Sequence, residues 1–274
     1  MLRKLLKYDF LSIKRFVIPL LLLTPSVAFA IGMIGYAGNR IEIPLIQMGM
    51  MTMYWLGILA LVLSVALLPV LLIIRYFTGM FGDAGYITLL LPVSRKMLLL
   101  SKVLNAVILM GGYVVVAFFS IGFVFFVPTT YGSGYGIFFA FKLLFEFVKG
   151  VLNYVGGPYA GVVVAIFCYL LLLLTFMFNL FFTGVTMGAA IFQGKAKIAG
   201  SIGFCFVAYI AWSVIKTAIE AIPTAILLTT DAESFMDPKV ELIFFIAETL
   251  LYAGFSVGLF FLNSHLIDRK LNLT

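Results

Sequence analysis

Residues 48–74 read MGMMTMYWLGILALVLSVALLPVLLII, and this stretch contains no charged side chain. A helix of this length, at about 1.5 Å per residue, is longer than the roughly 30 Å hydrocarbon core of a bilayer. Because a helix satisfies its own backbone hydrogen bonds, it can cross a layer that contains no water. The stretch therefore predicts a transmembrane helix, and its unbroken apolar run is not typical of the alternating strands of a membrane β-barrel.

The rest of the chain repeats this pattern. Hydrophobic residues make up 64% of the 274 residues, charged residues make up 11%, and the mean hydropathy is +1.20. Soluble domains contain only about 45–50% apolar residues. We therefore expect an all-α integral membrane protein with a single transmembrane domain over residues 1–274. Its six predicted spans are residues 16–38, 48–74, 97–127, 158–182, 198–228 and 240–263.

The basic residues indicate the topology. If the N-terminus is cytoplasmic, 13 of the 18 basic residues fall on the inner side. They are Arg3, Lys4, Lys7, Lys14, Arg15, Arg75, Arg95, Lys96, Lys102, Lys195, Lys197, Arg269 and Lys270. This distribution follows the positive-inside rule. The net charge of +7 is therefore attributed first to the orientation of the protein in the membrane, and only second to nucleic-acid binding. We expect both termini to be cytoplasmic.

Two segments outside the spans have the pattern of helices that lie on the membrane surface. The N-terminal segment places Leu2, Leu5 and Phe16 on one helical face and lysines on the other, although an ordinary positive flank would explain the same charges. Residues 137–154 place Lys142, Glu146, Lys149 and Asn153 in one polar stripe, with an expected Lys142–Glu146 pair. We expect an outer interfacial helix there, since a seventh span would reverse the charge asymmetry.

Two features near the end of the chain suggest departures from a plain span. Pro223 in the fifth span predicts a bend or a re-entrant turn. Glu248 lies inside the sixth span, where an ionised carboxylate costs several kcal/mol unless it is paired or hydrated. Together with Lys216 and Glu220 it forms a possible intramembrane polar site, and a carboxylate that merely locks two helices together is the alternative.

Small residues and missing motifs narrow the function. The glycine pairs Gly184–Gly188 and Gly254–Gly258 allow close approach of helices. The chain has no HExxH or CxxC motif, and its sole histidine is His265. Residues 188–195 (GAAIFQGK) do not have the spacing of a phosphate-binding loop. We therefore expect no catalytic residue, no metal site and no ATP hydrolysis by this chain.

Between the second and third spans, residues 82–96 read GDAGYITLLLPVSRK. A short helix can form up to Leu90, Pro92 stops it, and Ser94 is suited to cap the helix of the third span. We call residues 82–94 the elbow segment. Its acid Asp83 complements the start of the short helix, Arg95 marks the membrane surface, and three of its side chains can enter a partner's groove. Those three are Tyr86, Leu89 and Leu90.

This combination resembles the membrane permeases of type-2 ABC exporters, which have a basic amphipathic N-terminus, six spans and such a stretch between spans two and three. The matching residues are Asp83, Gly85, Tyr86, Leu91, Pro92, Ser94, Arg95 and Lys102. The resemblance covers the whole chain in layout and residues 82–102 in motif. The sequence departs from the family at Ala84, where a polar residue is commoner.

The resemblance implies a bacterial plasma-membrane protein that pairs with a second permease, identical or different. Its cytosolic coupling helix would dock on a separate ATP-binding cassette ATPase subunit, which binds the ATP and Mg²⁺, so this chain would bind no cofactor. Membrane lipid is the other expected partner, and nucleic acid is not expected. The Phe- and Met-rich spans favour a hydrophobic or amphipathic cargo, such as an antimicrobial peptide or a drug-like compound.

Two other functions remain open from the sequence. An ion-coupled secondary transporter or channel-like protein would use Glu248 and would need no ATP. A structural assembly factor would show neither ATP-driven nor ion-driven transport.

Overall fold

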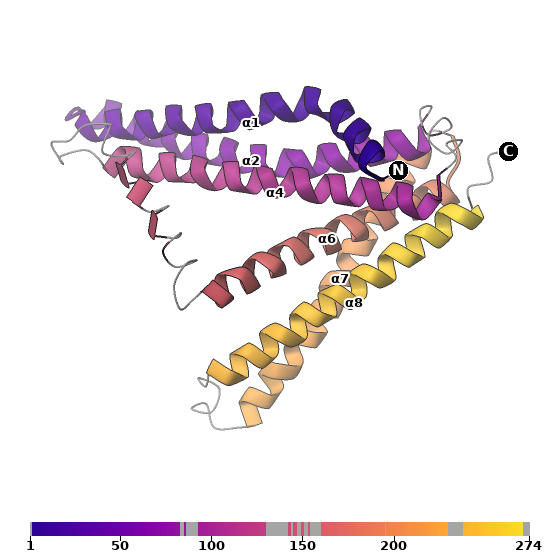
Figure 1. Ribbon diagram of the computed structural model, residues 1–274. Coiled ribbons are helices and arrows are strands. Elements are labelled where there is room, and N and C mark those ends of the chain that lie inside the picture. Colours follow the sequence, from indigo (N-terminus) through magenta and orange to yellow (C-terminus); the bar gives the residue numbers. More distant parts are fainter. Residues whose placement is uncertain are drawn as a thin grey trace. The chain divides into compact units, whose positions relative to one another are not determined.

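The computed structural model is all-helical over the residues it describes (Figure 1). These are residues 2–82, 85, 93–129, 142–143, 145–146, 149–150, 153, 160–194, 196–229 and 238–270. The helices are α1 (Leu2–Arg40), α2 (Pro44–Phe81), α4 (Arg95–Thr129), α6 (Ala160–Ile191), α7 (Ala196–Thr229) and α8 (Pro238–Lys270). All six are long and apolar enough to cross a membrane, and large apolar side chains such as Trp55 and Phe206 are exposed, as suits contact with lipid.

Five predicted spans lie within one of these helices, and the described part of the predicted span 158–182 lies in α6 from Ala160 onward. Most of the helices extend beyond the predicted ends. The N-terminal segment that we expected to be an interfacial helix is continuous with the first span, because α1 runs unbroken from Leu2 to Arg40. Its place at the membrane surface stays a prediction. The re-entrant turn predicted at Pro223 is wrong, since α7 continues as a helix to Thr229, and the alternative of a bend within the helix stays a prediction. Membrane helices tolerate proline because neighbouring groups replace the backbone bond that its ring removes.

The predicted outer interfacial helix at 137–154 falls largely outside the described residues. The expected pair within it is confirmed, with Lys142 Nζ lying 3.9 Å from Glu146 Oε1. Both side chains are well exposed, so the pair contributes little to stability.

The chain divides into two compact units. Unit 1 comprises residues 1–6, 73–107 and 169–274, and unit 2 comprises residues 7–72 and 108–168. Unit 2 therefore contains most of α1, the first part of α2 and the second part of α4. Unit 1 contains the end of α2, the start of α4, most of α6, and all of α7 and α8.

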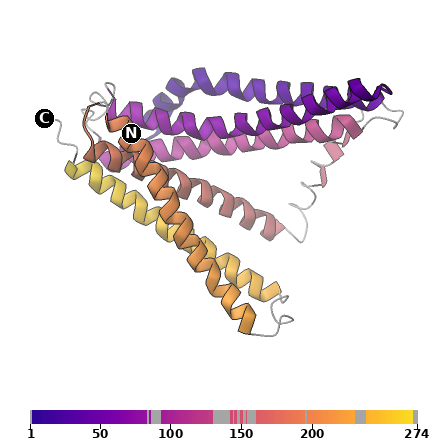
Figure 2. The ribbon, with the colours of Figure 1, turned by 180° about the vertical axis from the view of Figure 1, so that it is seen from behind.

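In unit 2, α1 packs closely against α2 and α4, and the three helices run side by side (Figures 1 and 2). A Cβ added to Gly32 would lie 2.7 Å from a backbone oxygen of α4, and one added to Gly35 would lie 2.9 Å from the ring of Tyr54. The hydroxyl of Tyr113 shares a hydrogen bond of 2.8 Å with Thr24 and donates to the carbonyl of Ser64 at 3.2 Å. One tyrosine of α4 thus bonds to both α1 and α2.

In unit 1, α6 is the central helix and contacts both α7 and α8. A Cβ added to Gly184 would lie 2.9 Å from the Cα of Cys205, and one added to Gly188 would collide with the backbone of Ser201. These glycines bring α6 and α7 into backbone contact, as their spacing predicts. On its other side α6 reaches α8 through hydrogen bonds, which are part of the candidate site.

Candidate functional site

The elbow segment is described only at its two ends. Gly85, Ser94 and Arg95 belong to the described residues, together with Gly82. The other predicted coupling residues lie outside them, and so does most of the predicted short helix. These residues are Asp83, Tyr86, Leu89, Leu90 and Pro92.

At the first end, the chain turns tightly against the last turn of α2. The amide of Gly85 donates to the carbonyl of Gly82 at 2.8 Å, and Gly85 is buried. A Cβ at Gly85 would collide with the carbonyl of Met80, and a Cβ at Gly82 would lie 2.7 Å from the carbonyl of Thr78. Both positions therefore need glycine because the backbone passes too close for any side chain.

At the second end, Ser94 directly precedes α4, and its carbonyl accepts a hydrogen bond of 3.0 Å from the amide of Met97. Ser94 therefore occupies the N-cap position that the sequence predicts. The next residue, Arg95, donates from Nη1 to the carbonyls of Ile267 at 2.7 Å and Asp268 at 3.1 Å, and lies 3.7 Å from the Asp268 carboxylate. The last carbonyls of a helix have no partner within it and carry partial negative charge, so the guanidinium stabilises the end of α8.

A second cation joins α7 to the end of α2. Lys197, in the first turn of α7, places Nζ 3.5 Å from the carbonyl of Phe81 and 5.9 Å from the centre of its ring. Phe81 is the last residue of α2 and immediately precedes the elbow segment. The two ends of the elbow segment are thus attached to α7 by Lys197 and to α8 by Arg95, and we call these two residues the elbow anchors.

Near these anchors, a buried hydrogen-bonded group joins α2, α6 and α8. The hydroxyl of Tyr76 lies 2.9 Å from Thr186 Oγ1 and accepts a hydrogen bond of 3.4 Å from the side-chain amide of Asn263. The Tyr76 ring stacks on Phe182 with ring centres 3.9 Å apart. Buried side-chain hydrogen bonds of this kind join helices where no water competes.

Further along α6, Asn179 Nδ2 donates to Ser256 Oγ of α8 at 2.9 Å. We call the whole series from Tyr76 to Asn179 the polar ladder, which consists of Tyr76, Thr186, Asn263, Asn179 and Ser256. Within the described part of the chain, the buried atoms Asn179 Oδ1 and Ser264 Oγ have no hydrogen-bond partner. The ladder was not predicted from the sequence, although asparagines inside apolar spans are a signal of helix–helix contact.

The intramembrane carboxylate predicted from the sequence pairs with a tyrosine. The hydroxyl of Tyr169 in α6 donates to Glu248 Oε1 at 3.0 Å, and Glu248 is half-buried. Among the described side chains Glu248 forms no ion pair, with Lys216 or with any other cation. Lys216 lies half-buried in α7, and the side chain of Glu220 falls outside the described residues.

Beside Glu248, aromatic side chains of three helices pack together. The ring centre of Phe176 lies 4.3 Å from that of Trp212 and 5.2 Å from that of Tyr252. Trp212 also lies 5.2 Å from Phe255, and Tyr252 lies 6.0 Å from Tyr169. These aromatic contacts fix α6, α7 and α8 around the Tyr169–Glu248 pair.

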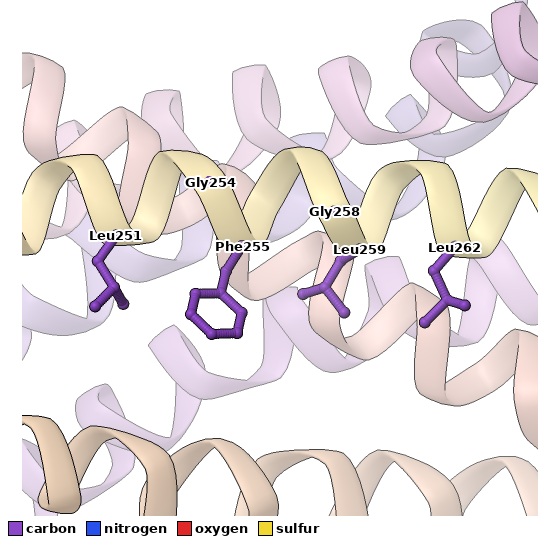
Figure 3. A pocket seen from close by; sticks show the side chains of 6 residues that line it. All are labelled: Leu251, Gly254, Phe255, Gly258, Leu259 and Leu262. Atoms are coloured by element: carbon purple, nitrogen blue, oxygen red, sulfur yellow. The ribbon is translucent and has the colours of Figure 1, made fainter.

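A shallow apolar groove of about 420 Å³ follows one side of α8 (Figure 3). We call it the α8 groove. Figure 3 shows the four side chains of Leu251, Phe255, Leu259 and Leu262 pointing to the same side of the helix. The remaining lining residues are Gly254 and Gly258.

The geometry thus offers two places for function: the anchored ends of the elbow segment, and the Tyr169–Glu248 pair with the α8 groove. Comparison with protein-family models, curated proteins and solved structures finds no match to this chain.

Proposed function

We propose that this chain is the membrane permease subunit of an ATP-driven type-2 ABC exporter, and that a separate subunit hydrolyses the ATP. The proposal starts from the elbow motif between the second and third spans, with Asp83, Tyr86, Pro92 and Arg95 in the family's order. The elbow segment would be the coupling helix that docks on the ATPase. The protein would lie in a bacterial plasma membrane, with both termini in the cytoplasm.

The observation that carries the proposal furthest is the attachment of both ends of the elbow segment. Lys197 contacts the last residue of α2, and Arg95 bonds to the last turn of α8. A displacement of the elbow segment by a motor subunit would therefore act on α7 and α8 directly. A loose connector between spans needs no such attachments. A ligand-driven change between two packings requires a rigid element that both states share, and the anchors supply it.

The basic residues at the same helix ends support the orientation. The end of α2, the start of α4, the start of α7 and the end of α8 meet through the elbow anchors. These four ends carry Arg95, Lys96 and Lys197, and the positive-inside rule places such residues in the cytoplasm. An ATPase that docks there would find ATP on its own side of the membrane.

A photo-crosslinking residue introduced at Tyr86 tests the assignment in native membranes. We expect it to capture a polypeptide that is also labelled by azido-ATP. The matched control carries the same crosslinker at Leu45, an 82% exposed residue in the first turn of α2, at the opposite end of that helix. Equal labelling of the captured product from both positions would reject the proposal.

Variants at the elbow test coupling in inverted membrane vesicles that contain the whole complex. We expect Tyr86→Ala, Pro92→Ala and Arg95→Ala to insert normally and to lose most ATP-driven export. Arg95→Lys should retain part of it, because lysine keeps the positive charge at the end of α8 but lacks the rigid, planar set of donors of the guanidinium. Wild-type transport and ATPase stimulation in Tyr86→Ala would contradict the role of the elbow.

One observation favours a second candidate, an ion-coupled transporter. Glu248 lies within a span with a tyrosine donor and no ion pair among the described residues, which is the environment of a proton-carrying carboxylate. Reconstitution of the chain alone distinguishes the two. Transport driven by a pH gradient without ATP, and lost in Glu248→Gln, would favour the second candidate.

A further inference from the structure

One side of α8 combines a carboxylate with an apolar groove. Glu248, Leu251, Phe255, Leu259 and Leu262 follow one another at steps of three or four residues. Residues at these steps lie on the same side of a helix. Glu248 therefore lies in line with the α8 groove, one helical turn before Leu251.

The groove is hollow because its two glycines have no neighbours. A Cβ added to Gly254 or to Gly258 would meet nothing within 4 Å. Phe255 and Leu262, which flank the glycines, are 39% and 43% exposed, so they form rims and not a closed core. Leu262 follows Glu248 by fourteen positions, which corresponds to about 20 Å along the helix.

The carboxylate of Glu248 has unused bonding capacity. A carboxylate offers about four lone-pair sites, and Tyr169 occupies one of them at 3.0 Å. No described cation pairs with Glu248, although a charge within a span is costly when unpaired. A ligand with a positive charge would remove this cost, and the ring of Tyr169 would add an aromatic surface suited to an ammonium or guanidinium group.

We propose that Glu248 and the α8 groove bind a cationic amphiphile. Its positive group pairs with the Glu248 carboxylate, and its apolar tail lies along Leu251, Phe255, Leu259 and Leu262. The inference rests on the proposed function and deepens it, because it assigns a cargo class to the permease. Binding measurements alone test the cationic-amphiphile site, so this site can be rejected while the permease assignment stands. Equally, the permease assignment can be rejected while the binding site stands.

The charge of Glu248 favours a cationic amphiphile in the α8 groove over a neutral lipid chain or a second copy of the chain. A neutral lipid chain would fill the apolar groove but would leave Glu248 without a counter-charge. A second copy of the chain that packed through the same stripe would bring another Glu248, and the described stripe contains no cation to meet it. A cationic amphiphile satisfies both the groove and the carboxylate.

Trp212 provides the readout, since its ring centre lies 5.2 Å from that of Phe255 in the groove. The sequence contains only one other tryptophan, Trp55, and Trp55→Phe leaves Trp212 as the sole reporter. The full chain is placed in nanodiscs of zwitterionic lipid. The probe is dodecyltrimethylammonium with bromine on its tail, which quenches a nearby tryptophan, and the matched neutral probe is dodecanol with the same bromine.

We expect saturable quenching by the cationic probe, with a Kd at least about tenfold below that of the neutral probe. Glu248→Gln keeps an acceptor for Tyr169 and removes the charge, so it should weaken the cationic probe about tenfold, or about 1.4 kcal/mol, and leave the neutral probe unchanged. Gly258→Leu fills open space and should abolish saturable quenching by both probes. Gly112→Leu in α4 is the matched control, because a Cβ there also meets nothing within 4 Å, and it should leave binding unchanged.

Three results would overturn the inference. Quenching that rises without saturation and equally for both probes would mean that ordinary lipid fills the groove. Equal binding of the cationic probe by Glu248→Gln and the parent would remove the carboxylate from the site. A fall in the mass of the assembled particle with Gly258→Leu, without an effect on quenching, would mean that a second copy of the chain covers this side of α8.

Discussion

On α6, Gly184 and Gly188 are buried against α7, whereas on α8 Gly254 and Gly258, with the same spacing, face open space. A Cβ added to the α6 glycines would meet α7 backbone atoms at 2.9 Å or less. A Cβ added to the α8 glycines would meet nothing within 4 Å. One pair forms a helix–helix contact, and the other hollows a groove.

A glycine pair therefore marks where a helix is thin but does not determine what fills the space beside it. α8 packs on α6 through another side, where Ser256 accepts a hydrogen bond from Asn179. Ser256 is two residues from each α8 glycine and hence lies on nearly the opposite side of the helix. The packed side of α8 carries the polar Ser256 and the aromatic Tyr252. The groove side is apolar, with Glu248 in line with it at one end.

The largest expected difference in stability is between two separate variants, one with leucine at Gly188 of α6 and one with leucine at Gly258 of α8. Gly188→Leu places a large side chain into the backbone of Ser201, which should cost about 3 kcal/mol or more and greatly reduce the yield of folded protein. Gly258→Leu should leave the unfolding temperature near that of the parent. Thermal unfolding followed by size-exclusion chromatography in detergent measures both, and equal losses would erase the contrast between the pairs.

A smaller change gives a graded test of the same contrast. Gly184→Ala adds one methyl group at 2.9 Å from the Cα of Cys205, and α7 must shift to accept it, at a cost of about 1–3 kcal/mol. Gly254→Ala adds the same group in open space and should be neutral. The comparison uses unfolding in increasing sodium dodecyl sulfate, and a destabilised Gly254→Ala would show that its surroundings are already filled.

The smallest expected effect concerns the packed side of α8. Ser256→Ala removes the acceptor of the Asn179 bond and should cost about 0.6 kcal/mol, as is common for bonds between membrane helices. Ser264→Ala removes a buried hydroxyl that has no partner among the described residues, and should be neutral or slightly stabilising. The same detergent titration ranks the two variants, and a larger loss from Ser264→Ala would reverse the order.

The lengths of the apolar runs predicted the spans well, because every spanning helix must be apolar over a stretch long enough to cross the hydrocarbon core. The predictions of where helices turn or end were less accurate, because the effect of a residue on its helix depends on the helices packed around it. Pro223 suggested a turn from its own chemistry, yet α7 continues to Thr229. The charges of the N-terminal segment suggested an interfacial helix, and the structure joins this segment to the first span without a break between Leu2 and Arg40.

The candidate site was predictable only in part. Glu248 was identifiable as the carboxylate of an apolar span, but its partner Tyr169 lies 79 residues away and has no sequence signal of its own. Lys197 and Arg95 were predicted as charges at the membrane surface. Their bonds to the ends of α2 and α8 depend on how distant helices meet, which local patterns do not encode.

The bonds of Tyr113 constrain the order in which unit 2 can be completed during synthesis. Thr24 and Ser64 enter the bilayer with α1 and α2 before the ribosome has made Tyr113, and Thr24 can meanwhile bond to the carbonyl of Leu20, 2.8 Å away. Only the arrival of α4 supplies the phenol that joins the two earlier helices. The hydrogen bonds that join α1 and α2 through Tyr113 can therefore form only after α4 has packed against both helices.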